Sequence, residues 1–476
     1  MKRTKIICTL GPASTNEDIM REMLESGMNV ARFNMSHGDH EEHTNRIAMF
    51  RRVRDELGVP AAVLLDMKGP EIRLRDFKDG SVILKDGDMF TLTSEDIIGD
   101  EKKASITYLN LPKDIKDGCK VLIDDGKVTL EVVSHDDKDI VCKVIYGGKV
   151  SNHKGINVPS VHLNMPYLSE VDKADLLFGI QQDVDFVAAS FVRTEKDVKD
   201  VREFLDYNGG NKIRIIAKIE NQEGIDNFDE ILRVANGIMV ARGDMGVEVD
   251  YEKLPGIQKR FIAKCRKAGK IVVTATQMLE SMVNNSSPTR AEISDVANAV
   301  FDGTSAIMLS GETASGKYPV HAVKTMARIA RRAELDAFEI GAYDKIEADI
   351  DADPTQAISH ATCTTAEDLK AKAIIAVTLY GTTARRISKF RPNVNIVAAT
   401  PDVKTYHQLS LSWGVCPVIS LQQNATDALF EHVIICAEQK KYVEQGDVVV
   451  ITAGVPLGVS GGTNTVKVEK VKIRSF

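Results

Sequence analysis

Hydrophobic and polar positions follow a pattern that recurs eight times along the chain. Each repeat has a short apolar run that ends in a polar or charged residue, and stretches of helical period separate most runs. The runs are 5–10, 29–34, 61–67, 186–191, 214–220, 237–243, 271–277 and 306–312. Continuous apolar runs of this length are typical of strands buried on both faces of a parallel sheet. The pattern therefore predicts an α/β protein built on a closed (β/α)8 TIM barrel.

The pattern changes abruptly after Gly69 and resumes near Pro166. Residues 70–166 show almost no helical period, and they carry four Asp-Gly pairs, which are a strong signal of turns between strands. We predict a small β-barrel domain inserted after the third barrel strand, where it could act as a lid over the barrel rim.

A third pattern occupies the C-terminal part, where apolar strands alternate with helical stretches and a last strand is expected near 464–471. The four earlier strands are expected at 373–378, 395–400, 415–420 and 447–454. This alternation predicts an open α/β domain. The predicted domains are a barrel of residues 1–69 and 167–345, an inserted lid of residues 70–166, and a regulatory α/β domain of residues 346–476.

Composition and charge limit the partners and the cellular compartment that we expect for this protein. The net charge of −7 and a pI near 5.9 give no general attraction to nucleic acid or to anionic membranes, so we expect neither as a partner. The seven cysteines are scattered, odd in number and never at CxxC spacing, which favours a reducing cytoplasm and disfavours a structural zinc site. The first apolar run is too short for a signal peptide, and no stretch is long enough for a membrane span.

Acids and cations stand at the ends of the predicted strands, and in a parallel barrel these ends share one rim. Glu220 and Asp244 are expected at equivalent positions on neighbouring strands. Two adjacent carboxylates suggest a hard divalent cation between them, and Mg²⁺ suits oxygen ligands. Lys218 projects from the same face as Glu220 and could neutralise charge on a phosphoryl group or an enolate. A salt-bridged rim without a metal is the alternative.

Further candidates lie on the other strands. Alternation puts Arg32, Asn34 and Ser36 on one face, where the guanidinium suits phosphate and the two oxygens suit a cation. Asp66 could face the same ion, and the Thr276 hydroxyl could orient a substrate carboxylate or a proton.

The C-terminal part carries a candidate anion site. The strand ending at Thr378 runs into Thr382 and Thr383 at a helix N-terminus, and Arg385 follows one turn later. The Gly-rich segment 454–463 could close over it. We expect an allosteric site for a sugar phosphate or a nucleotide; the alternative is an ordinary capped helix.

Several motifs together resemble pyruvate kinase of the bacterial type without an extra C-terminal domain. They are ARFNMSHG, LLDMKGPEIR, IIAKIENQEG, IMVARGDMGVE and TATQMLESM, and the likeness runs from about residue 5 to 470. The resemblance implies transfer of a phosphoryl group from phosphoenolpyruvate to ADP, giving pyruvate and ATP, the last step of glycolysis. It also implies a cytoplasmic homotetramer.

The resemblance also implies residue roles. Glu220 and Asp244 would hold Mg²⁺ or Mn²⁺, Lys218 would stabilise the transferring phosphoryl group and the enolate, and Arg32 would clamp the phosphate. The implied substrate site is Gly243, Asp244 and Thr276, and Arg73 and Lys154 would face the nucleotide. The implied K⁺ ligands are Asn34, Ser36, Asp66 and Met67.

One position departs from the family pattern, because the family usually has Thr where this chain has Met67. A thioether is a poor K⁺ ligand, so the site requires the backbone carbonyl of this residue. Glu71 favours K⁺ dependence, since members that do not need K⁺ carry Lys there. The group that protonates enolpyruvate stays open between Thr276 and a water relay near Ser310 and Glu312.

Two other functions would also use part of this pattern. A metal-dependent lyase or aldolase acting on pyruvate enolates would share the acids and the cation, but it would need neither Arg73 nor Lys154. A metabolite sensor with the barrel as a scaffold would gain nothing from paired acids at the rim.

Overall fold

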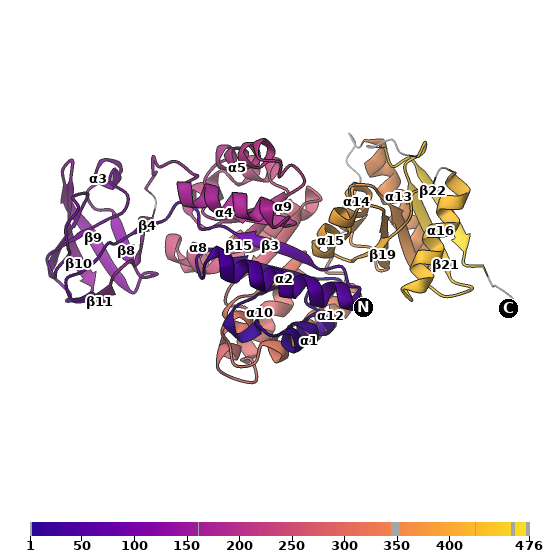
Figure 1. Ribbon diagram of the computed structural model, residues 1–476, viewed down its shortest axis with the longest axis horizontal. Coiled ribbons are helices and arrows are strands. Elements are labelled where there is room, and N and C mark those ends of the chain that lie inside the picture. The colour runs from indigo at the N-terminus through magenta and orange to yellow at the C-terminus, as the bar shows by residue number, and fades with distance from the viewer. Residues whose placement is uncertain (1, 160, 344–352, 424, 458–461, 473–476) are drawn as a thin grey trace.

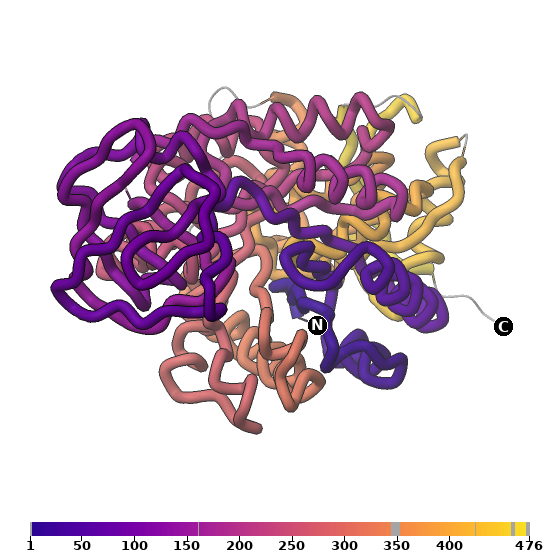
Figure 2. Tube along the Cα trace, turned by 60° about the vertical axis from the view of Figure 1, so that its left-hand side comes forward, coloured from indigo at the N-terminus to yellow at the C-terminus, as the bar shows by residue number. Residues whose placement is uncertain are grey.

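The computed structural model describes residues 2–159, 161–343, 353–423, 425–457 and 462–472. Three parts lie in a row: the barrel is in the middle, the inserted β domain is at one end, and the C-terminal α/β part is at the other (Figures 1 and 2). The described helices include none long and apolar enough to cross a lipid bilayer.

All eight apolar runs form strands of one closed parallel barrel, so the predicted TIM barrel is confirmed. The strands are almost entirely buried, as the continuous apolar runs require. Most strands end before the polar residues that close their runs, which leaves those residues on the rim. In sequence the strands are β1 (Lys5–Thr9), β2 (Val30–Asn34), β3 (Ala62–Asp66), β13 (Phe186–Ala189), β14 (Arg214–Ile219), β15 (Gly237–Ala241), β16 (Ile271–Ala275) and β17 (Ala306–Leu309).

Helices surround the barrel, and apolar side chains pack between them and the strands. Local sequence sets several helix starts, since the side chains of Asn16, Asp39 and Thr289 accept backbone N–H groups at the first turns. The longest of these helices, Pro319–Glu339, ends just before Gly341, which takes a left-handed φ of 67°. The main helices are α1 (Glu17–Ser26), α2 (His40–Leu57), α4 (Glu170–Gln181), α5 (Glu195–Tyr207), α7 (Phe228–Val234), α9 (Leu254–Lys267), α10 (Arg290–Phe301) and α12 (Pro319–Glu339).

The insert is a mixed, partly closed barrel of strands with its own apolar core and one short helix, α3 (Leu111–Asp114), so the predicted β domain is confirmed. All four Asp-Gly glycines have positive φ, but only Gly126 lies between two strands that pair directly, β8 and β9. The strands are β4 (Ile72–Arg73), β5 (Ser81–Leu84), β6 (Met89–Thr93), β7 (Lys103–Ser105), β8 (Lys120–Ile123), β9 (Val128–His135), β10 (Asp139–Tyr146), β11 (Gly148–Ser151) and β12 (Gly155–Asn157).

The C-terminal part is an open sheet in the order β20-β19-β18-β21-β22, in which only β22 is antiparallel to its neighbour. The predicted open α/β fold is confirmed, while the predicted domain limits stay predictions and the one at 345/346 lies outside the described residues. The elements are α13 (Pro354–Asp368), β18 (Ala373–Val377), α14 (Thr382–Lys389), β19 (Asn395–Thr400), α15 (Val403–Gln408), β20 (Val415–Ile419), α16 (Thr426–Gln439), β21 (Val448–Ala453) and β22 (Thr465–Lys470).

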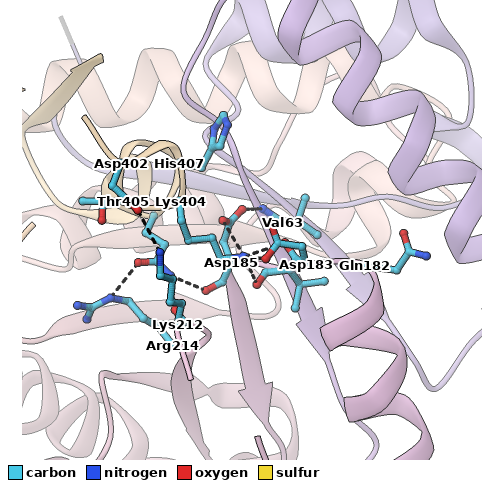
Figure 3. Close-up of polar contacts among 12 residues, drawn as sticks. Val63, Gln182, Asp183, Asp185, Lys212, Arg214, Asp402, Lys404, Thr405 and His407 are labelled. Atoms are coloured by element: carbon cyan, nitrogen blue, oxygen red, sulfur yellow. Dashed lines mark hydrogen bonds and ion pairs between the residues drawn. The ribbon is translucent and has the colours of Figure 1, made fainter. Parts of the chain in front are cut away.

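Helix α15 joins this part to the end of the barrel where strands β13 and β14 begin (Figure 3). The Lys404 ammonium donates to the carbonyls of Asp183 and Val184 at 2.8 and 2.7 Å, and it lies 3.6 Å from the Asp185 carboxylate. Asp185 is buried and accepts the Val63 N–H at 2.8 Å. Burial raises the pKa of Asp185 to about 6, although the Lys404 charge opposes this.

We expect Lys404→Met to destabilise the protein by about 3 kcal/mol at pH 8, because it removes the main counter-charge of the buried Asp185 carboxylate. A carboxyl whose pKa is raised in the folded state binds more protons there than in the unfolded chain, so its contribution to stability falls as pH rises from about 4 through the folded pKa. Removing Lys404 raises that pKa further. The deficit against wild type, measured as the thermal midpoint, should therefore be smaller at pH 5 than at pH 8.

Lys440→Met is the matched control, since Lys440 also reaches a barrel carbonyl, that of Gly58, at 3.1 Å. Its deficit should not change between the two pH values. An equally pH-independent deficit for Lys404→Met would contradict the role assigned to Asp185.

Candidate active site

A buried network joins the carboxyl ends of strands β2, β3 and β14. The Arg32 Nε donates to Asp66 Oδ2 at 2.6 Å, and the Lys218 Nζ donates to Asp66 Oδ1 at 3.1 Å. Burial favours a neutral Asp66, but the charges of Arg32 and Lys218 outweigh it and lower the Asp66 pKa. Two cations therefore share one carboxylate here, and the guanidinium and the ammonium are both groups that can bind an anion.

Lys218 also lies beside Glu220. Burial by itself favours the neutral amine, yet the carboxylates of Asp66 and Glu220 outweigh it and raise the Lys218 pKa. The Lys218 side chain is therefore an ammonium whose position is fixed by groups on three strand ends.

Glu220 follows the last residue of β14 and is fully buried. Its Oε2 accepts the Phe191 N–H at 2.6 Å, whereas its Oε1 lies 3.1 Å from Lys218 Nζ without making a hydrogen bond. Burial raises the Glu220 pKa to about 7, and the nearby Asp244 charge adds to the rise while Lys218 opposes it. An unsatisfied buried carboxylate oxygen of this kind fits a metal ligand.

Asp244 lies in the first turn of α8 (Arg242–Glu248), which corrects the expectation that it matches Glu220 on the neighbouring strand. The register pairs Ile219 with Val240, so Asp244 stands beyond the strand end. Within the described residues its carboxylate has no hydrogen-bond or ion-pair partner. It lines a cleft of about 360 Å³ between the barrel and the insert.

Asp244 on the wall of the cleft and Glu220 at the nearby end of β14 thus offer carboxylate oxygens that accept no hydrogen bond from any described residue, and their donor chemistry fits Mg²⁺ or Mn²⁺. No group of three His, Cys, Asp or Glu side chains that could hold a metal occurs in the described part of the chain. The remaining ligands would have to be water and substrate oxygens, as is usual for Mg²⁺.

The loop after β16 approaches the start of α8. The Gly243 N–H donates to the Thr276 hydroxyl at 2.8 Å, and this hydroxyl donates to the Ala275 carbonyl at 2.6 Å. Thr276 has a φ of 68°, an unfavourable value for a β-branched residue. Gly243, Asp244 and Thr276 are therefore brought together. Glu312, by contrast, accepts the N–H groups of Leu279 and Ser310.

The residues expected around K⁺ are only partly assembled. Asn34 Oδ1 accepts the Ser36 N–H at 3.1 Å, and Ser36 is exposed. The Asp66 carboxylate is turned to Arg32 and Lys218. The Met67 side chain is buried in the core between strands and helices, so only its carbonyl remains as a ligand, and that carbonyl accepts the Ser190 hydroxyl at 2.7 Å.

The cations expected to face the nucleotide are on the insert and pair with acids there. Arg73 forms an ion pair with Glu71 at 2.7 Å and donates to the His153 carbonyl. Lys154 pairs with Asp124 at 2.8 Å.

The C-terminal part has a cavity of about 280 Å³ at the N-terminus of α14. Thr378, Thr382 and Thr383 line it, and the Thr383 hydroxyl lies 2.7 Å from that of Thr463. Arg385 does not line this cavity, and it donates instead to the Tyr380 carbonyl. Part of the predicted closing loop, 458–461, lies outside the described residues.

Sequence reasoning missed Ser190, whose hydroxyl accepts a hydrogen bond from the Lys218 ammonium at 2.7 Å. Its only signal was its position near the end of the apolar run 186–191, on the same rim as the other candidates.

We expect the affinity for Mn²⁺ without substrate to be about tenfold weaker at pH 6 than at pH 8, because protons compete for a carboxylate with a pKa near 7. Glu220→Gln should weaken Mn²⁺ binding and abolish this pH dependence, as measured by titration calorimetry or Mn²⁺ paramagnetic resonance. Glu248→Gln is the control, since Glu248 lines the same cleft but accepts a hydrogen bond from Asn157. Unaltered binding in Glu220→Gln would contradict the metal site.

Comparison with known proteins agrees with this geometry. The family model of the pyruvate kinase barrel domain matches residues 1–323, and that of the pyruvate kinase alpha/beta domain matches residues 356–469. Pyruvate kinases of Clostridium acetobutylicum and Clostridium perfringens are 50% and 48% identical, each over 99% of this chain and 100% of the relative. That of Staphylococcus aureus is 47% identical over 99% of this chain and 81% of its own length. The crystal structure of a Cryptosporidium parvum pyruvate kinase covers 99% of this chain and 96% of its own, with a TM-score of 0.92 and 36% identity. The chain belongs to the pyruvate kinase family.

Proposed function

We propose that this phosphotransferase moves the phosphoryl group of phosphoenolpyruvate to ADP, giving pyruvate and ATP, with Mg²⁺ or Mn²⁺ and K⁺ as cofactors. The observation that supports this most directly is the network of Arg32, Asp66, Lys218 and Glu220 beside the unpartnered Asp244. It places two cations that suit a phosphate beside two carboxylates that suit a divalent ion, and Asp244 also lines the cleft between the barrel and the insert.

Each group has a role that its position supports. The Arg32 guanidinium binds the phosphate of the substrate, and Asp66 keeps that guanidinium in place. The Lys218 ammonium stabilises negative charge on the phosphoryl group during its transfer and on the enolate that the transfer produces. Gly243 and Asp244, at the start of α8, receive the substrate carboxylate with Thr276. Mg²⁺ held by Glu220 and Asp244 would supply further neutralisation of charge on the phosphoryl oxygens.

The insert completes the site in this proposal. Closure of the insert over the cleft would exclude water, which competes with ADP for the phosphoryl group. Arg73 and Lys154 would then exchange their acidic partners for the phosphates of ADP. Such an exchange is reasonable because both pairs are partly exposed and therefore weak.

K⁺ would bind near Asn34, Ser36, Asp66 and the Met67 carbonyl. A carbonyl ligand tolerates the change from Thr to Met, because the thioether points into the core. Glu71 supports a K⁺ requirement. A Lys at this position would supply a positive charge in place of K⁺, whereas Glu71 supplies a negative charge beside Arg73. We further propose a cytoplasmic homotetramer, with a phosphorylated metabolite as allosteric effector in the C-terminal cavity.

We expect pyruvate formation from phosphoenolpyruvate to require ADP, Mg²⁺ and K⁺ in a coupled lactate dehydrogenase assay. Lys218→Met should lower kcat by about 100- to 1000-fold, because the charge it supplies matters most in the transition state. Lys196→Met, which removes an exposed lysine paired with Asp200, should leave kcat unchanged. Pyruvate formation without ADP would favour the lyase alternative, and full turnover of Lys218→Met would favour the sensor.

We expect Thr382→Ala and Thr383→Ala to abolish activation by sugar phosphates or nucleoside monophosphates while basal kcat is retained. These hydroxyls line the cavity at the N-terminus of α14, where an anion is favoured. Thr364→Ala is the control, since its hydroxyl donates to the His360 carbonyl outside the cavity. Activation curves are measured at subsaturating phosphoenolpyruvate. If the curves of the two threonine variants coincide with that of wild type, the proposed effector site is wrong.

A further inference from the structure

Residues Ser190 and Phe191 form a turn that follows strand β13 and lies between β3 and β14. The turn contacts both charged groups at the end of β14, although neither of its side chains carries a charge. Its contacts form three sets: the Ser190 hydroxyl, the Phe191 N–H, and the Ser190 carbonyl.

The Ser190 hydroxyl is buried and makes three contacts. It accepts a hydrogen bond from Lys218 Nζ at 2.7 Å, and it lies 2.7 Å from the Met67 carbonyl and 3.1 Å from Asp66 Oδ1. A hydroxyl has one hydrogen to donate, so its donation goes to the Met67 carbonyl or to Asp66 while its lone pair faces the ammonium.

This arrangement excludes a covalent role for Ser190. A nucleophilic serine needs a neighbouring base to take its proton, but Lys218 is held as an ammonium by Asp66 and Glu220 and has no free lone pair. The other neighbour, Asp66, is a weak base because Arg32 and Lys218 lower its pKa. The hydroxyl therefore acts on the direction of the Lys218 side chain.

The Phe191 N–H holds the other group, because it donates to Glu220 Oε2 at 2.6 Å. Phe191 has a φ of 54°, a left-handed conformation that is rare for a bulky residue. Backbone in this state persists only where the surroundings enforce it. The unusual conformation directs the N–H to Oε2 of the carboxylate, while Oε1 faces the Lys218 ammonium.

The surroundings that enforce the turn are Tyr167 and Gly69. The buried Tyr167 hydroxyl donates to the Ser190 carbonyl at 2.7 Å. Gly69 packs against the same carbonyl so closely that a Cβ at residue 69 would lie 2.6 Å from its oxygen. The Ser190 carbonyl is thus held from two sides, by segments that flank the insert.

We propose that the Ser190–Phe191 turn, fixed by Tyr167, is the positioning element of this active site, aiming the Lys218 ammonium through a hydroxyl and the Glu220 carboxylate through an amide. Ser190 and Tyr167 are positioning residues that act through Lys218 and Glu220. The inference rests on the roles proposed above for those two residues.

The test uses the full-length enzyme with saturating Mg²⁺, K⁺ and ADP. Ser190→Ala should lower kcat by roughly 10- to 100-fold, the range expected when a charged group loses a buried hydrogen bond, with KM for phosphoenolpyruvate within about twofold. Tyr167→Phe removes one hydroxyl and keeps the ring. It should lower kcat and also raise the half-saturating Mg²⁺ concentration, because the turn holds Glu220 as well.

Two controls match these changes in chemistry. Ser388 is a buried serine that donates to the Trp413 carbonyl and accepts from Arg391, far from the cleft. Tyr343 donates its hydroxyl to the Val300 carbonyl. Ser388→Ala and Tyr343→Phe should lower the thermal midpoint about as much as the test variants, with kcat and Mg²⁺ dependence within about twofold of wild type.

A double-mutant cycle separates positioning from general stability. In a Lys218→Ala background, Ser190→Ala should lower kcat by less than about twofold more, since there is no ammonium left to aim. If Ser190→Ala lowers kcat in that background by the same factor as in the wild-type enzyme, the inference is wrong while the proposed function stands. The same holds if the kcat values of the test variants match those of their controls. Full turnover of Lys218→Ala alone would overturn both. If Ser190→Ala does not fold, the split between kcat and Mg²⁺ dependence in Tyr167→Phe decides the question.

Discussion

The active end of the barrel depends on one buried carboxylate, Asp66, held between two cations. Burial by itself favours the neutral form of this acid, and the charges of Arg32 and Lys218 outweigh it, while Asp66 offsets the repulsion between those two cations. The interaction joins the ends of three strands, so the chain must close the barrel before the site can exist. It also holds both cations at the carboxyl ends of their strands, where an anionic substrate would meet them already desolvated.

The fold could be predicted largely from the sequence because its signals are local. Each barrel strand is buried on both faces and is therefore a continuous apolar run in the sequence. The insert is indicated by its Asp-Gly turns and by the loss of helical period. The candidate site was predictable to the extent that parallel strands put their ends on one rim. This rule brought Arg32, Lys218 and Glu220 together without knowledge of any distance.

The rest of the site depends on contacts that no local pattern encodes. Asp244 was expected on a strand, but β15 ends at Ala241 and a helix begins at once, so the residue stands on a helical turn. Arg385 shares a sequence motif with the threonines of the C-terminal cavity and follows Thr382 by one helical turn, yet its side chain donates to the Tyr380 carbonyl. Ser190 reads as an ordinary small residue after a strand. Its importance arises only when β3, β13 and β14 lie side by side.

The contacts of helix α15 with the barrel involve the two strands that lead to the reactive groups. Lys404 and Gln408 hold the residues just before β13 and β14, and these same two strands lead to Ser190, Lys218 and Glu220 at their far ends. With four and six residues, strands β13 and β14 span only about 13 to 20 Å, and close packing in the barrel makes them stiff. Helix α15 and the reactive groups therefore contact opposite ends of the same two strands.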